Sequence, residues 1–178
     1  MKPVVDLQLA PISHDAFAPF GRVVQAGGSG MLVNGGTAHR YDIDSFPGAN
    51  VDSSLSLITS VFRADGLTLP RTIRMLERHP RTAQLIAPIS AHAHVIVVCS
   101  SRSDGSPDLQ TLSAFQLSAE QGVVYRPLVW HHPIIAIGQE SVFLVQSWQD
   151  STDRDCEITA IDPVSIIAHP DAGQEDRA

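Results

Sequence analysis

Two short polar stretches hold the residues best suited to chemistry. The first contains Glu77 and His79, followed by Gln84, and the second contains His131 and His132. On a β-strand, residues two apart share a face, so Glu77 and His79 can point into one cavity. A carboxylate beside an imidazole can move a proton or hold a metal ion. Taken alone, such a pair more often marks a solvated strand face with one buried, hydrogen-bonded histidine.

The spacing of these residues favours chemistry over packing. Cupin barrels place metal ligands as His-x-His with a carboxylate four or five positions on, and a further His after a Pro-x-Gly-x-x-His turn. Glu77, His79 and Gln84 have the first spacing, and Pro127 to His132 has the second with Val in place of Gly. We therefore predict Glu77, His79 and His132 as catalytic residues. Mixed N and O ligands from His79, Gln84 and His132 would hold a divalent metal, with modest affinity because Gln is a weak ligand.

Other motifs are weaker candidates. His92 and His94 form a His-x-His pattern, but no carboxylate follows at the right distance, so we interpret them as half-exposed strand histidines. A serine nucleophile has no Gly-x-Ser-x-Gly elbow to support it. Neither Cys99 nor Cys156 lies beside a basic motif that would activate a thiol.

The elements that must position these residues are short β-rich runs separated by Gly, Pro, Asp and Ser, a pattern typical of an all-β sandwich or barrel. The runs are Leu55–Phe62, Ala83–Ile89, Ala93–Cys99, Gly122–Tyr125, Val129–Ile137 and Val142–Trp148. The segment Pro70–Arg78 alternates and is predicted as a strand. Short helices are expected after a Ser13 cap and near Ser118. We expect one catalytic domain over residues 1–165 and a polar tail over residues 166–178, frayed from Asp171.

Composition narrows the class of protein. The chain has 178 residues, 43% of them hydrophobic and 17% charged, which suits a single globular domain. A net charge of -7, without a basic cluster, argues against nucleic-acid and membrane partners. Two cysteines are too few for a disulfide framework, and the N-terminus lacks the apolar run of a signal peptide. A cytoplasmic location is therefore expected.

Several of these stretches, in one register over residues 11–160, resemble the ureidoglycolate lyase family. The likeness is carried by Leu76–Pro80 with Gln84 and Pro88, Pro107–Leu109, Glu120–Val123 with Tyr125, and Val129–Pro133. Weaker support comes from Ala16-Phe17, Phe20-Gly21, Asn34, Gly36, Arg40-Tyr41, Ser60–Arg63 and Asp155–Glu157. The chain departs from the family pattern at Arg126, Gly35 and Ile86, where His, Asn and Phe are usual.

The resemblance implies a cupin-like β-barrel, that is, a double-stranded β-helix with a few short helices. It also implies a homodimer that cleaves ureidoglycolate to glyoxylate and urea in allantoin and purine degradation. Some family members are attributed nickel or another divalent ion, and no organic cofactor is expected. The predicted substrate-binding residues are Asn34, Arg40, Arg63, Gln84, Trp130 and His131, with a buried core position as the alternative for Trp130.

The substrate chemistry assigns roles to these residues. Cleavage of the C–N bond needs a base for the hydroxyl proton and an acid or a metal to help urea leave, which Glu77, His79 and His132 can supply. The carboxylate of the substrate needs a cation, and both Arg40 and Arg63 are candidates. Two other classes remain open at this point: a metal-dependent cupin oxygenase or isomerase, and a non-catalytic module that binds a small acid or a sugar.

Overall fold

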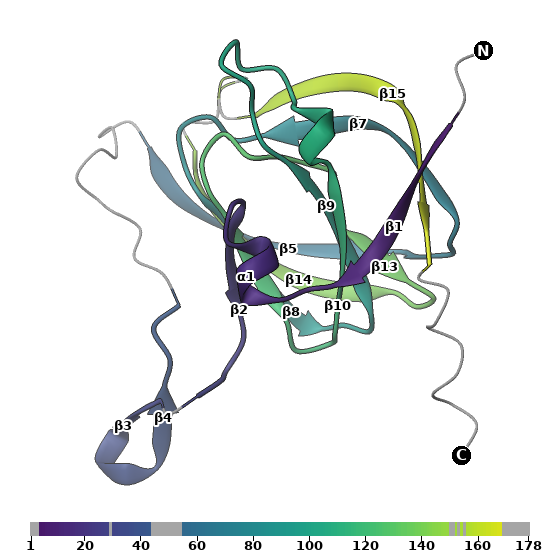
Figure 1. The fold of residues 1–178 in the computed structure, drawn as a ribbon. Coiled ribbons are helices and arrows are strands. Elements are labelled where there is room, and N and C mark those ends of the chain that lie inside the picture. Colours follow the sequence, from purple (N-terminus) through teal and green to yellow (C-terminus); the bar gives the residue numbers. More distant parts are fainter. Residues whose placement is uncertain are drawn as a thin grey trace, which may run out of the picture.

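The computed structural model describes residues 4–28, 30–43, 55–149, 152, 154 and 156–168. Its elements are β1 (Val5–Pro11), α1 (His14–Phe17), β2 (Gly21–Val24), β3 (Met31–Val33), η1 (Asn34–Gly36), β4 (Ala38–Arg40), β5 (Ser56–Ala64), β6 (Gly66–Leu67), β7 (Arg71–Arg78), β8 (Gln84–Ser90), β9 (His94–Cys99), η3 (Leu109–Thr111), β10 (Ser113–Leu117), β11 (Gly122–Tyr125), β12 (Trp130–His131), β13 (Ile135–Ile137), β14 (Ser141–Gln149) and β15 (Glu157–Ile167). Strands dominate the described residues (Figure 1), which confirms the all-β prediction. No helix among the described residues has the length and apolar character needed to cross a membrane.

The strands form a closed ring and a second sheet. In the ring, β9 pairs with β10, which continues through β1, β15, β7 and β12 back to β9. The second sheet has the order β2-β11-β8-β14-β5. The second sheet packs on the face of β9 that points out of the ring, where the rings of His94 on β9 and Phe143 on β14 meet edge to face at 5.1 Å. This closed arrangement is the expected cupin-like barrel.

Strand β9 is buried along its whole length. Its residues Val95, Val97 and Cys99 belong to an apolar cluster inside the ring, together with Leu76 and Trp130. The alternate residues Ile96 and Val98 belong to a second cluster, shared with the five-stranded sheet. A strand with apolar side chains on both faces reads as an unbroken hydrophobic run, and the sequence of β9 has this character.

Most expected elements are present. The strand predicted over Pro70–Arg78 is β7, and the Ser13 side chain caps α1 by accepting a hydrogen bond from the Ala16 amide at 3.2 Å. The run predicted over Val129–Ile137 is divided into β12 and β13, because Pro133 between them has no N–H for a ladder. At Ser118 the chain makes a hydrogen-bonded turn to Gln121 rather than a helix.

The C-terminal strand runs past the boundary expected at residue 165. It continues to Ile167, and the Ile166 side chain is fully buried in the ring cluster. The predicted frayed segment from Asp171 lies outside the described residues.

A hairpin arm, formed by β3, η1 and β4, projects from the barrel (Figure 1). Its turn contains three successive residues in the left-handed region, Asn34, Gly35 and Gly36, a conformation that glycine adopts without strain. The Thr37 hydroxyl donates to the Asn34 carbonyl at 2.9 Å and closes the turn. The main contacts of β3 and β4 are with each other and with η1, so the arm packs little against the rest of its own chain.

Candidate active site

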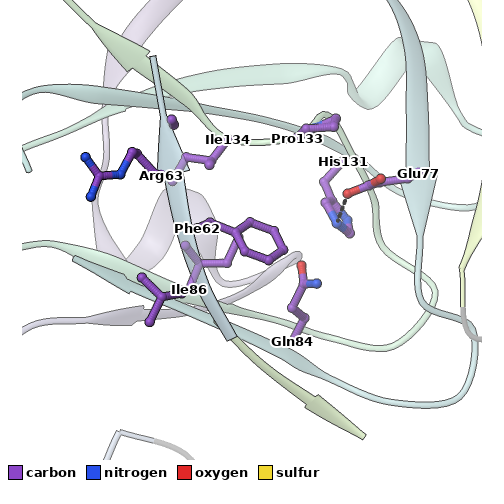
Figure 2. Close-up of a pocket in the computed structure, with 10 residues that line it drawn as sticks. Phe62, Arg63, Glu77, Gln84, Ile86, His131, Pro133 and Ile134 are labelled. Atoms are coloured by element: carbon purple, nitrogen blue, oxygen red, sulfur yellow. Dashed lines mark ion pairs between the residues drawn. The ribbon is translucent and has the colours of Figure 1, made fainter. Parts of the chain in front are cut away.

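Strand pairing brings the two polar stretches of the sequence together. His131 on β12 lies directly opposite Glu77 on β7 in the antiparallel ladder. His79 follows the end of β7, and Gln84 begins β8. Glu77, Gln84 and His131 point toward a common space between the ring and the second sheet (Figure 2).

The distances define a compact cluster. His131 Nε2 lies 3.6 Å from Glu77 Oε1, and His79 Nε2 lies 2.8 Å from Gln84 Nε2. One ligand atom from each of Glu77, His79 and His131 falls within 4.8 Å of the other two. The imidazole rings of His79 and His131 have centroids 5.4 Å apart. Groups able to accept, donate or coordinate are thus concentrated at one point of the barrel.

The hydrogen bonds of His131 define its tautomer. Its Nδ1 lies 3.0 Å from the Val129 carbonyl, which can only accept, so Nδ1 carries the proton and Nε2 keeps its lone pair. Burial, with smaller contributions from the neighbouring His79 and His132, lowers the pKa of His131 to about 3, although the backbone hydrogen bond acts in the opposite direction. The contact with Glu77 is therefore one between a neutral imidazole and a carboxyl group, and not an ion pair at neutral pH.

Glu77 is the acidic member of the cluster. Burial raises the pKa of its carboxyl group, and the attraction of His79 partly opposes that rise. Its Oε2 lies 4.0 Å from the Cys156 thiol at the start of the last strand segment. The nearest arginine in sequence, Arg78, is bound instead to Glu157 and lies over the Trp130 ring at 4.6 Å. Glu77 is therefore not held in an ion pair with Arg78, and a raised pKa suits a general base that works near neutral pH.

The cluster opens onto a cavity of about 410 Å3, within the range of small-molecule sites, roughly 300–1,000 Å3. Its walls are mainly apolar and are formed by Val61, Phe62, Arg63, Ala64, Glu77, Gln84, Ile86, His131, Pro133 and Ile134. Phe62 extends its ring over the space, while the guanidinium of Arg63 points away from Glu77 (Figure 2). Arg63 pairs with Glu140 at 2.9 Å, and both side chains are exposed, so this pair is easily broken.

The predicted site residues fall into two groups. The structure brings together Glu77, His79 and Gln84, and it places Arg63 at the cavity wall. His132 was predicted as the catalytic histidine of this group, but the structure places His131 there, which was predicted as a substrate-binding residue. Successive strand residues face opposite sides, and the His132 ring turns away, with Nδ1 2.7 Å from the Pro133 carbonyl.

Three predicted substrate-binding residues lie elsewhere. Asn34 and Arg40 belong to the hairpin arm, where Arg40 pairs with Asp42 at 2.7 Å. Trp130 is buried in the ring cluster, and its Nε1 donates to the Gly105 carbonyl at 3.0 Å. Within one chain, none of the three is among the residues that line the cavity.

Sequence reasoning missed two neighbours of the cluster. Tyr125 stacks on His131, and Cys156 lies beside Glu77. The choice of His131 over His132 did have a signal in the sequence. Trp130 is large and apolar and belongs in a core, so His131, the next residue on the same strand, must face the opposite side. For Cys156 no local signal exists, because its proximity depends on β15 pairing with β7.

The donor set fits a divalent metal ion. The Nε2 lone pair of His131 is buried and has no hydrogen-bond partner in the described part of the chain, and it faces a carboxylate oxygen and a second imidazole. Two imidazole nitrogens and a carboxylate are common ligands of zinc, nickel and iron. The residues that fit are thus Glu77, His79 and His131, with Gln84 beside them, in place of the predicted set that contained His132.

The closed ring, the second sheet and an inward Glu/His cluster over a small-molecule cavity define a cupin-like enzyme. The model of the family "Ureidoglycolate lyase" matches residues 4–168. The chain belongs to this family.

Curated relatives agree with this assignment. The chain is 38% identical over 141 residues to a ureidoglycolate lyase of Pseudomonas syringae pv. tomato, covering 78% of this chain and 81% of that protein. It is 39% identical over 140 residues to one of Rhizobium etli, covering 78% and 82%. Over 153 residues it is 37% identical to one of Pseudomonas fluorescens, covering 85% and 89%.

The matches among solved structures are more distant. A dTDP sugar isomerase from Desulfovibrio desulfuricans G20 superposes with a TM-score of 0.43 at 16% identity, covering 79% of this chain and 82% of that one. An oxalate decarboxylase superposes with a TM-score of 0.40 at 16% identity, covering 59% and 24%.

Proposed function

We propose that this chain is a carbon–nitrogen lyase that cleaves ureidoglycolate to glyoxylate and urea, the step that releases both products in allantoin and purine degradation. The observation that carries the proposal is the cluster of Glu77, His79 and His131 at the wall of a cavity suited to a small molecule, in a chain of this family. The substrate is a small acid whose reacting carbon bears a hydroxyl, a carboxylate and a ureido nitrogen.

Residues of the site can supply both proton transfers that the cleavage requires. The Glu77 carboxylate removes the hydroxyl proton, the C–O electrons form the carbonyl of glyoxylate, and the C–N bonding pair leaves on the ureido nitrogen. That nitrogen takes up a proton, from protonated Glu77 or from His79, and departs as urea. Neutral His131 cannot donate at Nε2, because this atom has no proton, so its role is to accept a hydrogen bond or to coordinate.

A divalent metal is part of the proposal. Glu77, His79 and His131 would hold it, with Gln84 adjacent, and a bound ion would lower the pKa of the substrate hydroxyl and stabilise the developing carbonyl. The carboxylate of the substrate would bind Arg63, which borders the cavity, if its guanidinium left Glu140 and turned from the outer side of β5 toward the cavity. A cytoplasmic location remains part of the proposal, and the free thiols Cys99 and Cys156 are consistent with it.

We further propose a homodimer built on the outer face of the five-stranded sheet. The ladder β8-β14-β5 directs apolar side chains outward there, namely Leu57, Val61, Leu85, Ala87, Leu144 and Trp148. Leu57 and Val61 are 49% and 64% exposed. Arg63, near one end of β5, is the charged residue among the outward side chains of these three strands, and the rest of the face can pack against its own copy about a twofold axis without like charges meeting.

The outer face alone is smaller than a stable interface, and the hairpin arm can supply the missing area. Three strands about 4.8 Å apart and about 30 Å long cover roughly 400 Å2, about half of the roughly 800 Å2 that each partner buries in a stable interface. The arm exposes Met31 and Leu32 and can supply additional area on a second copy. In that arrangement Asn34 and Arg40 would reach the cavity of the partner. We propose that they bind substrate in this way, across the dimer interface.

Assay of the purified protein tests the proposed activity directly. Ureidoglycolate is supplied, and glyoxylate and urea are followed with added Ni2+ and, separately, after treatment with a chelator. Equal amounts of both products, formed well above the spontaneous rate and lost in a Glu77→Gln variant, are expected. Release of glyoxylate only at the spontaneous rate would contradict the proposal and favour an oxygenase, an isomerase or a binding module.

A further inference from the structure

Tyr125 is the closest aromatic neighbour of the His131 imidazole. The two rings are stacked, with centroids 4.3 Å apart and planes inclined by 16°. Tyr125 ends β11 and pairs in the ladder with Gln84, so the backbone of the site holds both the tyrosine and the amide. The ring cannot move away freely, because Phe17 packs against it at 6.2 Å within the buried cluster.

Stacking restricts the one motion that remains to His131. The Nδ1 hydrogen bond to the Val129 carbonyl holds one edge of the imidazole, but rotation about that edge would still redirect Nε2. A parallel ring at van der Waals distance blocks such rotation. Nε2 is thereby kept toward Glu77 Oε1, at 3.6 Å.

The hydroxyl of Tyr125 gives a second observation. Among the described residues, two buried side-chain polar atoms lack a hydrogen-bond partner, and they are Tyr125 Oη and His131 Nε2. The phenol can donate one hydrogen bond, and its ring lies on the imidazole whose Nε2 faces Glu77. A phenylalanine would fill the same space without a buried, unpaired hydroxyl, which is costly to a fold.

We propose that Tyr125 is a positioning residue of this site, whose ring sets the direction of His131 Nε2 and whose hydroxyl donates a hydrogen bond to an oxygen atom of the bound ligand beside Glu77. The first part concerns the protein alone. The second part rests on the proposed function, since the ligand is then ureidoglycolate or glyoxylate. Both offer a carboxylate and a second oxygen that can accept from a phenol.

Two substitutions separate the ring from the hydroxyl. Tyr125→Phe keeps the stack and removes the hydroxyl, while Tyr125→Leu removes both. Phe115→Leu is the matched control, because Phe115 belongs to the same apolar cluster but is not in ring contact with His131. All three variants are compared with the original protein by imidazole 15N NMR, glyoxylate binding by calorimetry, turnover and melting temperature.

The NMR experiment tests the ring. The original protein and Tyr125→Phe should show His131 as one tautomer with the proton on Nδ1 and a sharp Nε2 resonance. Tyr125→Leu should keep that tautomer but shift and broaden the Nε2 resonance, because the imidazole can then rotate about its Nδ1 hydrogen bond. Phe115→Leu should lower the melting temperature and leave the His131 shifts unchanged. Unchanged His131 shifts in Tyr125→Leu would overturn the role of the ring, whether or not the protein acts on ureidoglycolate.

Binding and turnover test the hydroxyl. Loss of one hydrogen bond to a charged ligand predicts a decrease of roughly 10- to 100-fold in glyoxylate affinity and in kcat/KM for Tyr125→Phe. The melting temperature should stay the same or rise. Full affinity and turnover in Tyr125→Phe would overturn the role of the hydroxyl. An original protein that binds glyoxylate but does not turn over ureidoglycolate would instead contradict the proposed function.

Discussion

Glu77 and His131 face each other across neighbouring strands, with Oε1 and Nε2 3.6 Å apart and Nε2 unprotonated. A lone pair beside a carboxylate is an unfavourable contact unless a proton or a cation lies between the two. Burial raises the pKa of Glu77, which favours a proton at this contact, and a bound divalent ion would be the alternative. The pair therefore favours the binding of a proton or a cation, which the fold itself does not supply.

Replacing Glu77 with Gln removes the charge and keeps the size. Turnover should fall roughly 10²–10⁴-fold, because a base or ligand is lost. The melting temperature should be unchanged or higher, since a half-buried carboxylate beside a lone pair is costly. Activity and melting are measured on one preparation. Preserved turnover with a lowered melting temperature would instead make Glu77 a structural residue.

Neighbouring histidines give a matched comparison. His131→Gln should abolish the binding of Ni2+ measured by calorimetry and reduce turnover strongly, because Nε2 of His131 faces Glu77. His132→Gln should retain both, since its ring faces the Pro133 carbonyl. The reverse pattern would restore the assignment of His132 that the spacing favoured.

Activity should depend on the ionisation of Glu77. The reaction needs the carboxylate, and burial raises the pKa of Glu77 above its usual value of 4.5. The acid limb of the kcat/KM profile should therefore lie at a higher pH than an exposed glutamate would give. Glu77→Gln should remove this limb from the residual rate. A limb at or below pH 4.5 would count against Glu77 as the base.

The stability of the fold should depend on the ionisation of His131 between its folded and its unperturbed pKa values. Its pKa is about 3 in the folded protein and 6.5 when unperturbed, so between these values the unfolded chain binds the extra proton. The contribution of His131 to stability is therefore complete above about pH 6.5 and is lost as the pH falls toward 3. Urea denaturation at pH 7 and pH 5 should show a smaller loss of stability in His131→Gln than in the original protein. Equal losses would contradict the buried, neutral imidazole.

The homodimer and its arm can be tested by mixing subunits. Arg40→Ala and Glu77→Gln chains should each be inactive, and their co-expression should restore about one quarter of the activity, because half of the dimers contain one intact site. The exposed Arg74→Ala is the control for Arg40, and should be fully active alone. Full activity of Arg40→Ala, or no recovery on co-expression, would exclude an arm that acts in the partner.

The thiols should differ in reactivity. Cys99 is fully buried and its pKa is raised to about 12, whereas Cys156 is partly exposed beside Glu77. N-ethylmaleimide should add slowly to Cys156 alone, as seen by mass spectrometry, and should reduce turnover by crowding the Glu77 carboxylate. Cys156→Ser should stay active and resist the reagent. An alkylated protein with full activity would show that this side of Glu77 is not needed.

The sequence predicted what depends on local pattern. Alternation and punctuation predicted β7, β8, β9 and β14, and the spacing of Glu77, His79 and Gln84 predicted three members of the cluster. It failed where the outcome depends on register. Whether His131 or His132 faces the cavity differs by one residue, and a shift by one residue reverses the face of a side chain.

The pairing of strands that are distant in the sequence could not be predicted either. Tyr125 and Cys156 approach the site only because β11 pairs with β8 and β15 pairs with β7. Similarly, Arg40 was predicted from a resemblance of sequence, which gives no information on whether an arm folds onto its own barrel or extends from it.

Strand β9 belongs to both apolar clusters, and this shared membership couples them mechanically. Neither side of the barrel can open while β9 keeps its place, because the same backbone carries Val97 toward one side and Val98 toward the other. The amide hydrogens of β9 should therefore exchange with solvent only when the whole molecule unfolds, and at one common rate. In heat or denaturant, the barrel should melt as a single unit rather than in layers.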